Sequence, residues 1–157
     1  MKTHEYKAFI DWTCSRGIGT TDYSAYERNY SVRVNGKQQV IHGSADSAFR
    51  GDPSRFNPEE LFLASISSCH MLWYLHLCAD NGIVVVEYAD SATGTMIEKP
   101  EGGGHFQEVI LHPLVTVEKE EMVEKAKLLH LDAHKKCFIA NSCNFPIRQN
   151  PTVNFKL

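Results

Sequence analysis

The sequence predicts an α+β fold, and three observations lead to this prediction. Short segments of alternating apolar and polar residues, typical of antiparallel strands, lie before and after a long apolar segment. That apolar segment begins at an Asn-Pro-Glu-Glu motif, which is a strong helix start. A second, amphipathic segment near the C-terminus predicts another helix. The length of 157 residues fits a single domain spanning 1–157.

The N-terminal part predicts an antiparallel meander. Residues 5–13 and 29–35 alternate apolar and polar side chains, and residues 14–23 have the composition of a loop. Gly36-Lys37 predicts a turn that leads into a third strand over 38–42.

The first helix is expected to run from Asn57 to about Asp80. Asn57 is a good cap, proline is tolerated at the first helical position, and the two glutamates that follow suit the positive end of the helix dipole. From Leu61 to Ala79 the helix is apolar on nearly every side, and small residues cluster just before Cys69. This pattern predicts the buried centre of the fold, packed closely against another helix.

The second half predicts a hairpin, a helix and a final strand. Residues 83–98 and 106–117 read as two long strands joined by a run of three glycines, and residues 152–157 resemble a last strand. Between them, the expected helix over 118–136 has an apolar stripe that reaches Cys137 one step beyond its end. The stripe consists of Met122, Ala126, Leu129 and Ala133.

Composition narrows the classes of function. The net charge of −3, with 22% charged and 43% hydrophobic residues, is that of an ordinary globular protein, and no basic run indicates a nucleic-acid partner. No uninterrupted apolar run of about 18 residues indicates a membrane span, and the N-terminus lacks the apolar stretch of a secretory signal. We therefore expect a cytoplasmic protein without a membrane partner.

The chain has five cysteines, and in the cytoplasm these would be kept reduced. Catalysis, metal binding or simple burial are then better explanations than a disulfide framework. Cys69 is either a small core residue or a reactive thiol, and composition does not decide between them. A reactive thiol needs a nearby positive charge to lower its pKa, and an arginine of the preceding loop suits this better than His70 or His76.

Glu59 bears on the assembly. Ten helical residues span about 15 Å, so on an unbroken helix Glu59 cannot touch Cys69 of its own chain. Two such helices packed antiparallel in a twofold dimer would bring Glu59 of one chain near Cys69 of the other. The alternative is that Glu59 serves only the N-terminus of its helix.

A rival site lies on the second helix. His130, His134 and Cys137 follow the i, i+4, i+7 spacing of one helix face, which suits metal ligation, although no acidic ligand joins them. Cys14, Cys78 and Cys143 are interpreted as packing thiols, with Cys143 a possible substitute for Cys137. No cofactor signature is found, since the glycines at 17–19 lack the lysine of a phosphate-binding loop.

Two segments carry a resemblance to a known family. Asn57-Pro-Glu-Glu-Leu-Phe-Leu-Ala-Ser-Ile-Ser-Ser-Cys69-His resembles the OsmC/Ohr family of thiol-dependent hydroperoxide reductases, in which the Asn-Pro-Glu motif, small residues and the reactive cysteine have this spacing. Ala133-His-Lys-Lys-Cys137-Phe-Ile-Ala-Asn-Ser142 is similar to the segment around the family's second cysteine. The order of strands and helices extends the resemblance to nearly the whole chain.

The resemblance implies a fold and an assembly. These are antiparallel sheets wrapped around two long central helices in an intertwined homodimer, with active sites at the subunit interface. The expected substrate is a small organic hydroperoxide, and a dithiol is the expected reductant; no cofactor is implied. The alternatives are a non-catalytic small-molecule-binding dimer of the same fold and the metal-binding protein described above.

The resemblance also assigns roles. Cys69 would attack the peroxide and become a sulfenic acid, and Cys137 would then form a disulfide with it. An arginine would hold the thiolate and Glu59 would orient that arginine. Arg50 matches one family branch by its distance from the Asn-Pro-Glu motif and is the favoured residue, while Arg28 matches another. An apolar pocket for the alkyl group is expected from Leu61, Phe62, Met71 and Trp73.

Overall fold

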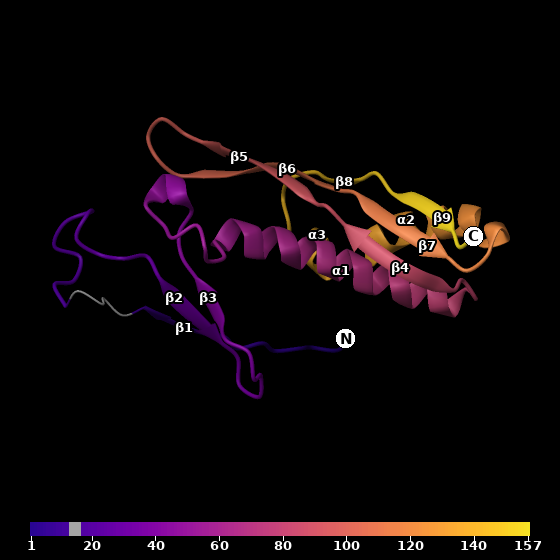
Figure 1. Ribbon diagram of the computed structural model, residues 1–157, viewed down its shortest axis with the longest axis horizontal. Coiled ribbons are helices and arrows are strands. Elements are labelled where there is room, and N and C mark those ends of the chain that lie inside the picture. Colours follow the sequence, from indigo (N-terminus) through magenta and orange to yellow (C-terminus); the bar gives the residue numbers. More distant parts are fainter. Residues whose placement is uncertain (13–16) are drawn as a thin grey trace. The chain divides into compact units, whose positions relative to one another are not determined.

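The computed structural model describes residues 1–12 and 17–157, which form two compact units, 1–61 and 62–157 (Figure 1). The boundary falls in the first turn of helix α1 (Pro58–Asp80). The expectation of a single domain over 1–157 therefore stays a prediction. Each unit has its own β-sheet structure.

The first unit contains the predicted meander. β1 (Phe9–Trp12), β2 (Tyr30–Arg33) and β3 (Ile41–Gly43) pair antiparallel in this order. The turn is found where glycine predicts it, with Gly36 at a φ of 79°, but β3 begins three residues later than expected. A short 3-10 helix, η1 (Ser47–Phe49), precedes α1.

The second unit contains two three-stranded sheets (Figure 1). Each of the two long strands predicted for the hairpin is divided in two, so that one half joins each sheet. The first gives β4 (Val85–Asp90) and β5 (Thr93–Glu98), and the second gives β6 (Gly104–Leu111) and β7 (Pro113–Val117).

The division of the strands is explained by the contacts of Asp90. Its carboxylate accepts the His112 backbone N–H at 2.7 Å and the Ser67 hydroxyl at 2.5 Å. Pro113, the next residue, has no N–H for a ladder. The hydrogen bond that would continue the ribbon is therefore replaced by side-chain bonds, and the ribbon passes from one sheet to the other at this point.

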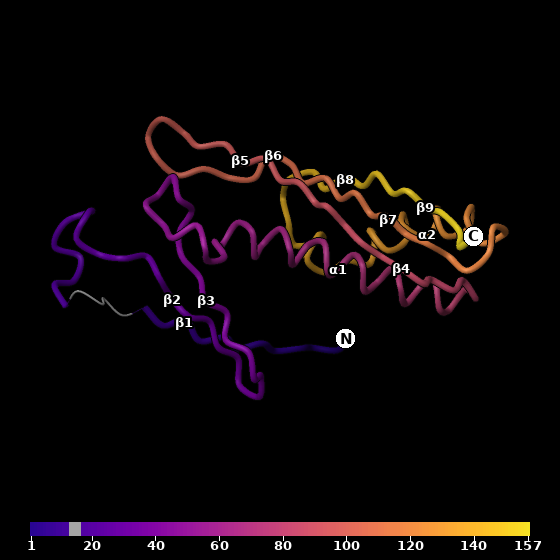
Figure 2. The backbone as a smooth tube through the Cα atoms, in the orientation of Figure 1, coloured from indigo at the N-terminus to yellow at the C-terminus, as the bar shows by residue number. Residues whose placement is uncertain are grey.

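The C-terminal strands add a parallel pair to each of the two sheets, whose other pairs are antiparallel as expected. β8 (Ile147–Gln149) pairs parallel with β6, and β9 (Thr152–Phe155) pairs parallel with β7. The tube in Figure 2 shows this last segment running along both sheets. β9 confirms the predicted final strand, whereas β8 was missed because only three residues take part. The α+β class is confirmed.

Helix α1 confirms its predicted ends and partly corrects its predicted burial. Asn57 caps it reciprocally with Glu60: the Glu60 N–H donates to Asn57 Oδ1 at 2.7 Å, and Asn57 N–H donates to Glu60 Oε2 at 3.0 Å. Within the chain the helix buries a single stripe, formed by Ile66, His70, Tyr74 and Cys78. Leu72 is 63% exposed, so much of the apolar surface is uncovered in one chain. By length and composition α1 would also suit a membrane span, as core helices often do.

The second helix is shorter than predicted. Residues 120–122 form the 3-10 helix η2 (Glu120–Met122), and α2 follows over Val123–Lys136. Its buried side chains confirm the predicted stripe at Ala126, Leu129 and Ala133. Together with Tyr74 and Cys78 of α1, these belong to the larger core cluster, and a smaller cluster surrounds Ile66. α3 (Phe138–Asn141) follows directly.

Candidate functional site

Cys69 and Cys137 lie side by side in the second unit. Cys69 comes from the middle of α1 and is half-buried, whereas Cys137 sits between α2 and α3 and is fully buried. Burial, and then the hydrogen bond with the neighbouring Cys69 thiol, raise the pKa of the Cys137 thiol to about 12. Neither cysteine is in a disulfide. The structure thus brings together an accessible thiol and a protected one.

Trp73 helps to hold this pair together. It lies one turn after Cys69 on α1, and it contacts the residues on both sides of Cys137. The ring of Phe138 meets the Trp73 ring edge-on at 5.7 Å, and the Lys136 ammonium lies 5.6 Å from the Trp73 ring centre. Cys137 is therefore anchored to the α1 turn that carries Cys69.

The backbone at Cys137 does not support the metal-binding alternative. Cys137 leaves the helix with φ −67° and ψ 108°, and it caps α3, whose Ala140 N–H donates to the Cys137 sulfur at 3.5 Å. The helix therefore ends before Cys137, and Cys137 does not share a continuous helix face with His130 and His134 as the i, i+4, i+7 spacing predicted. Over residues 1–12 and 17–157, no group of three or more His, Cys, Asp or Glu side chains is arranged to hold a metal ion.

The other cysteines fit the packing interpretation where they are described. Cys78 is buried in the larger core cluster, and burial raises the pKa of its thiol. Cys143 packs against the smaller cluster, donates a hydrogen bond to the Ile139 carbonyl at 3.2 Å, and also has its pKa raised by burial. Cys14 lies outside the described residues.

Both candidate arginines belong to the first unit and line one pocket of about 390 Å³. The Arg28 guanidinium is bound within its own loop. It donates hydrogen bonds to the carbonyl of Tyr26 at 2.5 Å and to that of Tyr23, and it stacks on both tyrosine rings. Arg50 is exposed and has a φ of 64°, a left-handed conformation that is uncommon for any residue but glycine. Among the described residues the Arg50 guanidinium makes no hydrogen bond, although its charge, after the hydrogen bonds from Ser24, helps to lower the pKa of Asp22. Of the two arginines, Arg50 is therefore the better placed to bind a ligand.

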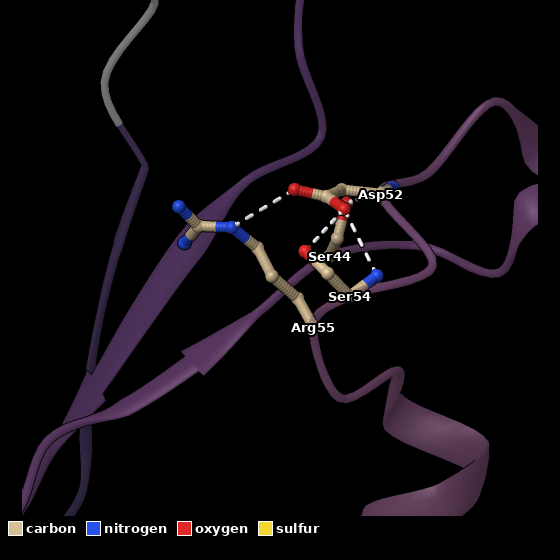
Figure 3. A network of polar contacts seen from close by, with 4 residues as sticks. All are labelled: Ser44, Asp52, Ser54 and Arg55. Atoms are coloured by element: carbon tan, nitrogen blue, oxygen red, sulfur yellow. Dashed lines mark hydrogen bonds and ion pairs between the residues drawn. The ribbon is translucent and has the colours of Figure 1, made fainter.

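The loop around Arg50 is held by two aspartates. The Asp46 side chain accepts from Ala48 N–H at 2.8 Å and from the Asn57 amide at 3.2 Å, which ties the loop to the start of α1. On the other side, Asp52 is the centre of the network in Figure 3. It accepts from Ser54 and Arg55, and its own N–H donates to the Ser44 hydroxyl.

Glu59 is placed at the start of α1 with an unused oxygen. Its Oε2 atom is buried and has no hydrogen-bond partner among the described residues. The Tyr30 side chain is close by, since burial and then the Glu59 carboxylate raise the pKa of Tyr30. An unpaired buried carboxylate oxygen costs free energy, so Glu59 has capacity for a cationic partner such as an arginine.

The expected apolar pocket is only partly found. Trp73 lines a shallow pocket of about 220 Å³ with Leu72 and His76, on the same face of α1 as Cys69. Phe62 instead packs on Phe106 and Phe145, in the smaller core cluster. Leu61 and Met71 do not line this pocket.

A buried histidine pair, which was not predicted from the sequence, joins α1 and α2. His70 Nε2 and His130 Nδ1 are 3.0 Å apart, and each side chain is 1% exposed. Burial and then the nearby His134 lower the pKa of His70 to about 4, although Asp90 opposes the shift. Burial and then His70 lower the pKa of His130 to about 3. No sequence signal links two residues 60 positions apart.

This pair predicts acid sensitivity. Both imidazoles are neutral in the folded chain and protonate near pH 6.5 when unfolded, so the unfolded state binds more protons between pH 6.5 and about 4. The contribution of the two neutral imidazoles to the free energy of unfolding is fully present above pH 6.5 and is lost as the pH falls towards 4. At pH 5 we expect a loss of about 2 kcal/mol per imidazole in the free energy of urea unfolding. The His70→Leu/His130→Leu variant should lose less stability over this range, and an equal loss in both proteins would contradict the assignment.

Comparison with known proteins identifies the family. The family model described as OsmC-like protein matches residues 51–151. An OsmC-like protein of unknown function from Vibrio cholerae is 28% identical, with a TM-score of 0.85 over 96% of this chain and 100% of that one. An organic hydroperoxide resistance protein OsmC from Legionella pneumophila is 18% identical, with a TM-score of 0.70 over 98% of this chain and 99% of that one.

A third solved structure has the same fold. It is an organic hydroperoxide resistance protein from Elizabethkingia anophelis, 21% identical, with a TM-score of 0.69 over 99% of this chain and 100% of that one. No curated protein sequence matches the chain. Because the family model spans well over half of the sequence and includes both cysteine motifs, the chain belongs to the OsmC-like family.

Proposed function

We propose that the protein is a thiol peroxidase that reduces organic hydroperoxides. Half-buried Cys69 lies beside fully buried Cys137, and this arrangement is the main support for the proposal. A peroxide can reach the first thiol but not the second, so the two cysteines have different roles. Structural relatives from Legionella and Elizabethkingia are named organic hydroperoxide resistance proteins, which supports this substrate class.

The proposed catalytic cycle has three steps. The Cys69 thiolate attacks the outer oxygen of ROOH, the O–O bond breaks, and RO⁻ leaves as ROH after taking up a proton, which produces Cys69 sulfenic acid. The Cys137 thiol then attacks the sulfenic sulfur, its proton leaves with the hydroxyl as water, and a Cys69–Cys137 disulfide forms. A dithiol reduces the disulfide and restores both thiols.

The high pKa of Cys137 fits the second role. A buried thiol with a pKa of about 12 carries almost no thiolate at neutral pH, so it does not compete for peroxide. Cys137 reacts only after Cys69 has become a sulfenic acid. The two sulfurs are then held next to each other, and this proximity compensates for the low fraction of thiolate.

For Cys69, Arg50 is the proposed partner, with Glu59 orienting it and Arg28 as the alternate. Arg50 is exposed, whereas the Arg28 guanidinium already donates to two carbonyls. Glu59 and Cys69 are separated by about 15 Å of continuous helix, so this arrangement requires a second chain. The uncovered apolar surface of α1 is the proposed contact of a homodimer.

The arginine assignment predicts a selective kinetic effect. Replacing Arg50 with alanine removes the charge that stabilises the thiolate, so we expect the second-order rate constant for peroxide attack to fall by about a hundredfold. Stopped-flow oxidation under single-turnover conditions measures this constant. Arg33→Ala is the matched control, because Arg33 is an exposed arginine of the same unit that pairs with Asp11 on the neighbouring strand, and its loss should leave the rate unchanged. An unchanged rate in Arg50→Ala, with a loss in Arg28→Ala, would transfer the role to Arg28.

The substrate class is tested by steady-state kinetics. With a dithiol reductant, we expect cumene hydroperoxide and a lipid hydroperoxide to have a higher kcat/KM than hydrogen peroxide. No dithiol-dependent consumption of any of the three would favour the non-catalytic binding alternative.

Cytoplasmic location remains part of the proposal and is tested by fractionation of the source cells.

A further inference from the structure

The His70–His130 pair is unusual in how it is bonded. The two rings bond to each other at 3.0 Å, and the remaining nitrogen of each, His70 Nδ1 and His130 Nε2, is buried without a hydrogen-bond partner among the described residues. The His130 ring also stacks on Tyr74, with ring centres 3.8 Å apart. Each imidazole therefore has the other as its hydrogen-bonding partner.

If the histidine pair served only to fill the core, it would carry an unnecessary free-energy cost. A buried unpaired polar atom costs about 1–3 kcal/mol, and two such atoms remain after the one bond has formed. A pair of apolar side chains would fill the same space without that cost. A hydrogen bond, unlike an apolar contact, is directional, so the histidine pair can fix the relative position of the two helices that it joins.

The pair connects the two segments that carry the cysteines. His70 is the residue after Cys69 on α1, and His130 lies seven residues, or about two helical turns, before Cys137. Ala126, Leu129 and Ala133 of α2 lie in the same core cluster as Tyr74 and Cys78 of α1, and such apolar contacts have no preferred direction. Trp73 holds the last residue of α2, Lys136, whereas the histidine bond holds the helix about two turns earlier. A hydrogen bond between two ring nitrogens forms at only one position of α2 along α1.

We propose that the His70–His130 hydrogen bond sets the register of α2 against α1 and thereby positions Cys137 for disulfide formation with Cys69. The inference rests on the cysteine pairing of the proposed function. A slip of α2 by one helical turn would move Cys137 by about 5.4 Å, whereas a disulfide requires Cβ atoms about 3.5–4.5 Å apart. The histidines act through Cys137 and are positioning residues.

The test measures the thiol–disulfide equilibrium without peroxide. Reduced protein is equilibrated with oxidised and reduced glutathione, and the fraction of Cys69–Cys137 disulfide gives the effective concentration of the two thiols. The variant is His70→Leu/His130→Leu, which removes both partners together and leaves neither imidazole unpaired. His105→Leu, an exposed histidine on β6, is the control.

We expect the effective concentration to fall at least tenfold in the double variant and to stay within twofold of wild type in His105→Leu. Should the double variant fail to fold, His130→Phe keeps a ring against Tyr74 while removing the bond, and the same tenfold fall is expected. His130→Gln, whose amide can replace the imidazole as a partner, should recover most of the loss.

A folded double variant with the wild-type effective concentration would overturn the inference, as would a wild-type protein that forms no Cys69–Cys137 disulfide with glutathione. Because the exchange uses no peroxide, the outcome is separate from the proposed peroxidase activity. A tenfold fall in a protein without peroxidase turnover would support the positioning role and reject only the proposed function.

Discussion

Replacing Cys69 with serine is expected to abolish peroxide turnover, with a loss of at least a thousandfold in kcat/KM. The serine hydroxyl stays protonated at neutral pH and is a far weaker nucleophile than a thiolate, so the first step cannot proceed. Cys137 cannot replace Cys69, because it is fully buried and its pKa is raised to about 12. Cumene hydroperoxide consumption, coupled to a dithiol reductant, is the measurement.

The matched control for this variant is Cys78→Ala. Cys78 lies on the same helix, two to three turns further along, and is a packing residue of the larger core cluster. We expect Cys78→Ala to lose stability but to keep its turnover per folded chain. Substantial turnover in Cys69→Ser would show that a different group attacks the peroxide.

Replacing Cys137 with serine is expected to leave one round of peroxide reduction and then stop. The peroxide step needs only Cys69, so one equivalent of hydroperoxide should be consumed at the wild-type rate. Without the second thiol, the sulfenic acid persists and should react with a carbon nucleophile such as dimedone, adding one label per chain. Mass spectrometry of the Cys69 peptide checks both the site and the stoichiometry.

A backup thiol would change this result. If Cys143 could replace Cys137, the single variant would continue to turn over, and only Cys137→Ser/Cys143→Ser would trap the sulfenic acid. We expect the single and double variants to behave alike, because the Cys143 thiol is held in the smaller core cluster with its hydrogen bond to Ile139.

The local signals of the sequence predicted the elements that position the cysteines. Asn57 and the glutamates after Pro58 predicted the start of α1 to within a residue, because capping depends on side chains close in sequence. The apolar stripe of α2 placed Cys137 at the end of that helix, next to a core surface. The geometry of the pair, with one thiol accessible and one buried, depends on Trp73 meeting residues more than 60 positions away.

Features that depend on distant contacts were not predictable in this way. The break in the long ribbon is produced by the Asp90 carboxylate, which accepts hydrogen bonds from Ser67 of α1 and from His112, between β6 and β7. The three residues of β8 pair only because β6 is already in place. The His70–His130 bond, across 60 positions, has no local pattern at all.

The most direct test of the central claim is a thiol count and disulfide map after one equivalent of cumene hydroperoxide. We expect fully reduced protein, with five thiols per chain, to lose two of them. Proteolysis without reduction should then yield one linked pair of peptides, containing Cys69 and Cys137. An unchanged thiol count, or a disulfide that excludes Cys69, would contradict the claim.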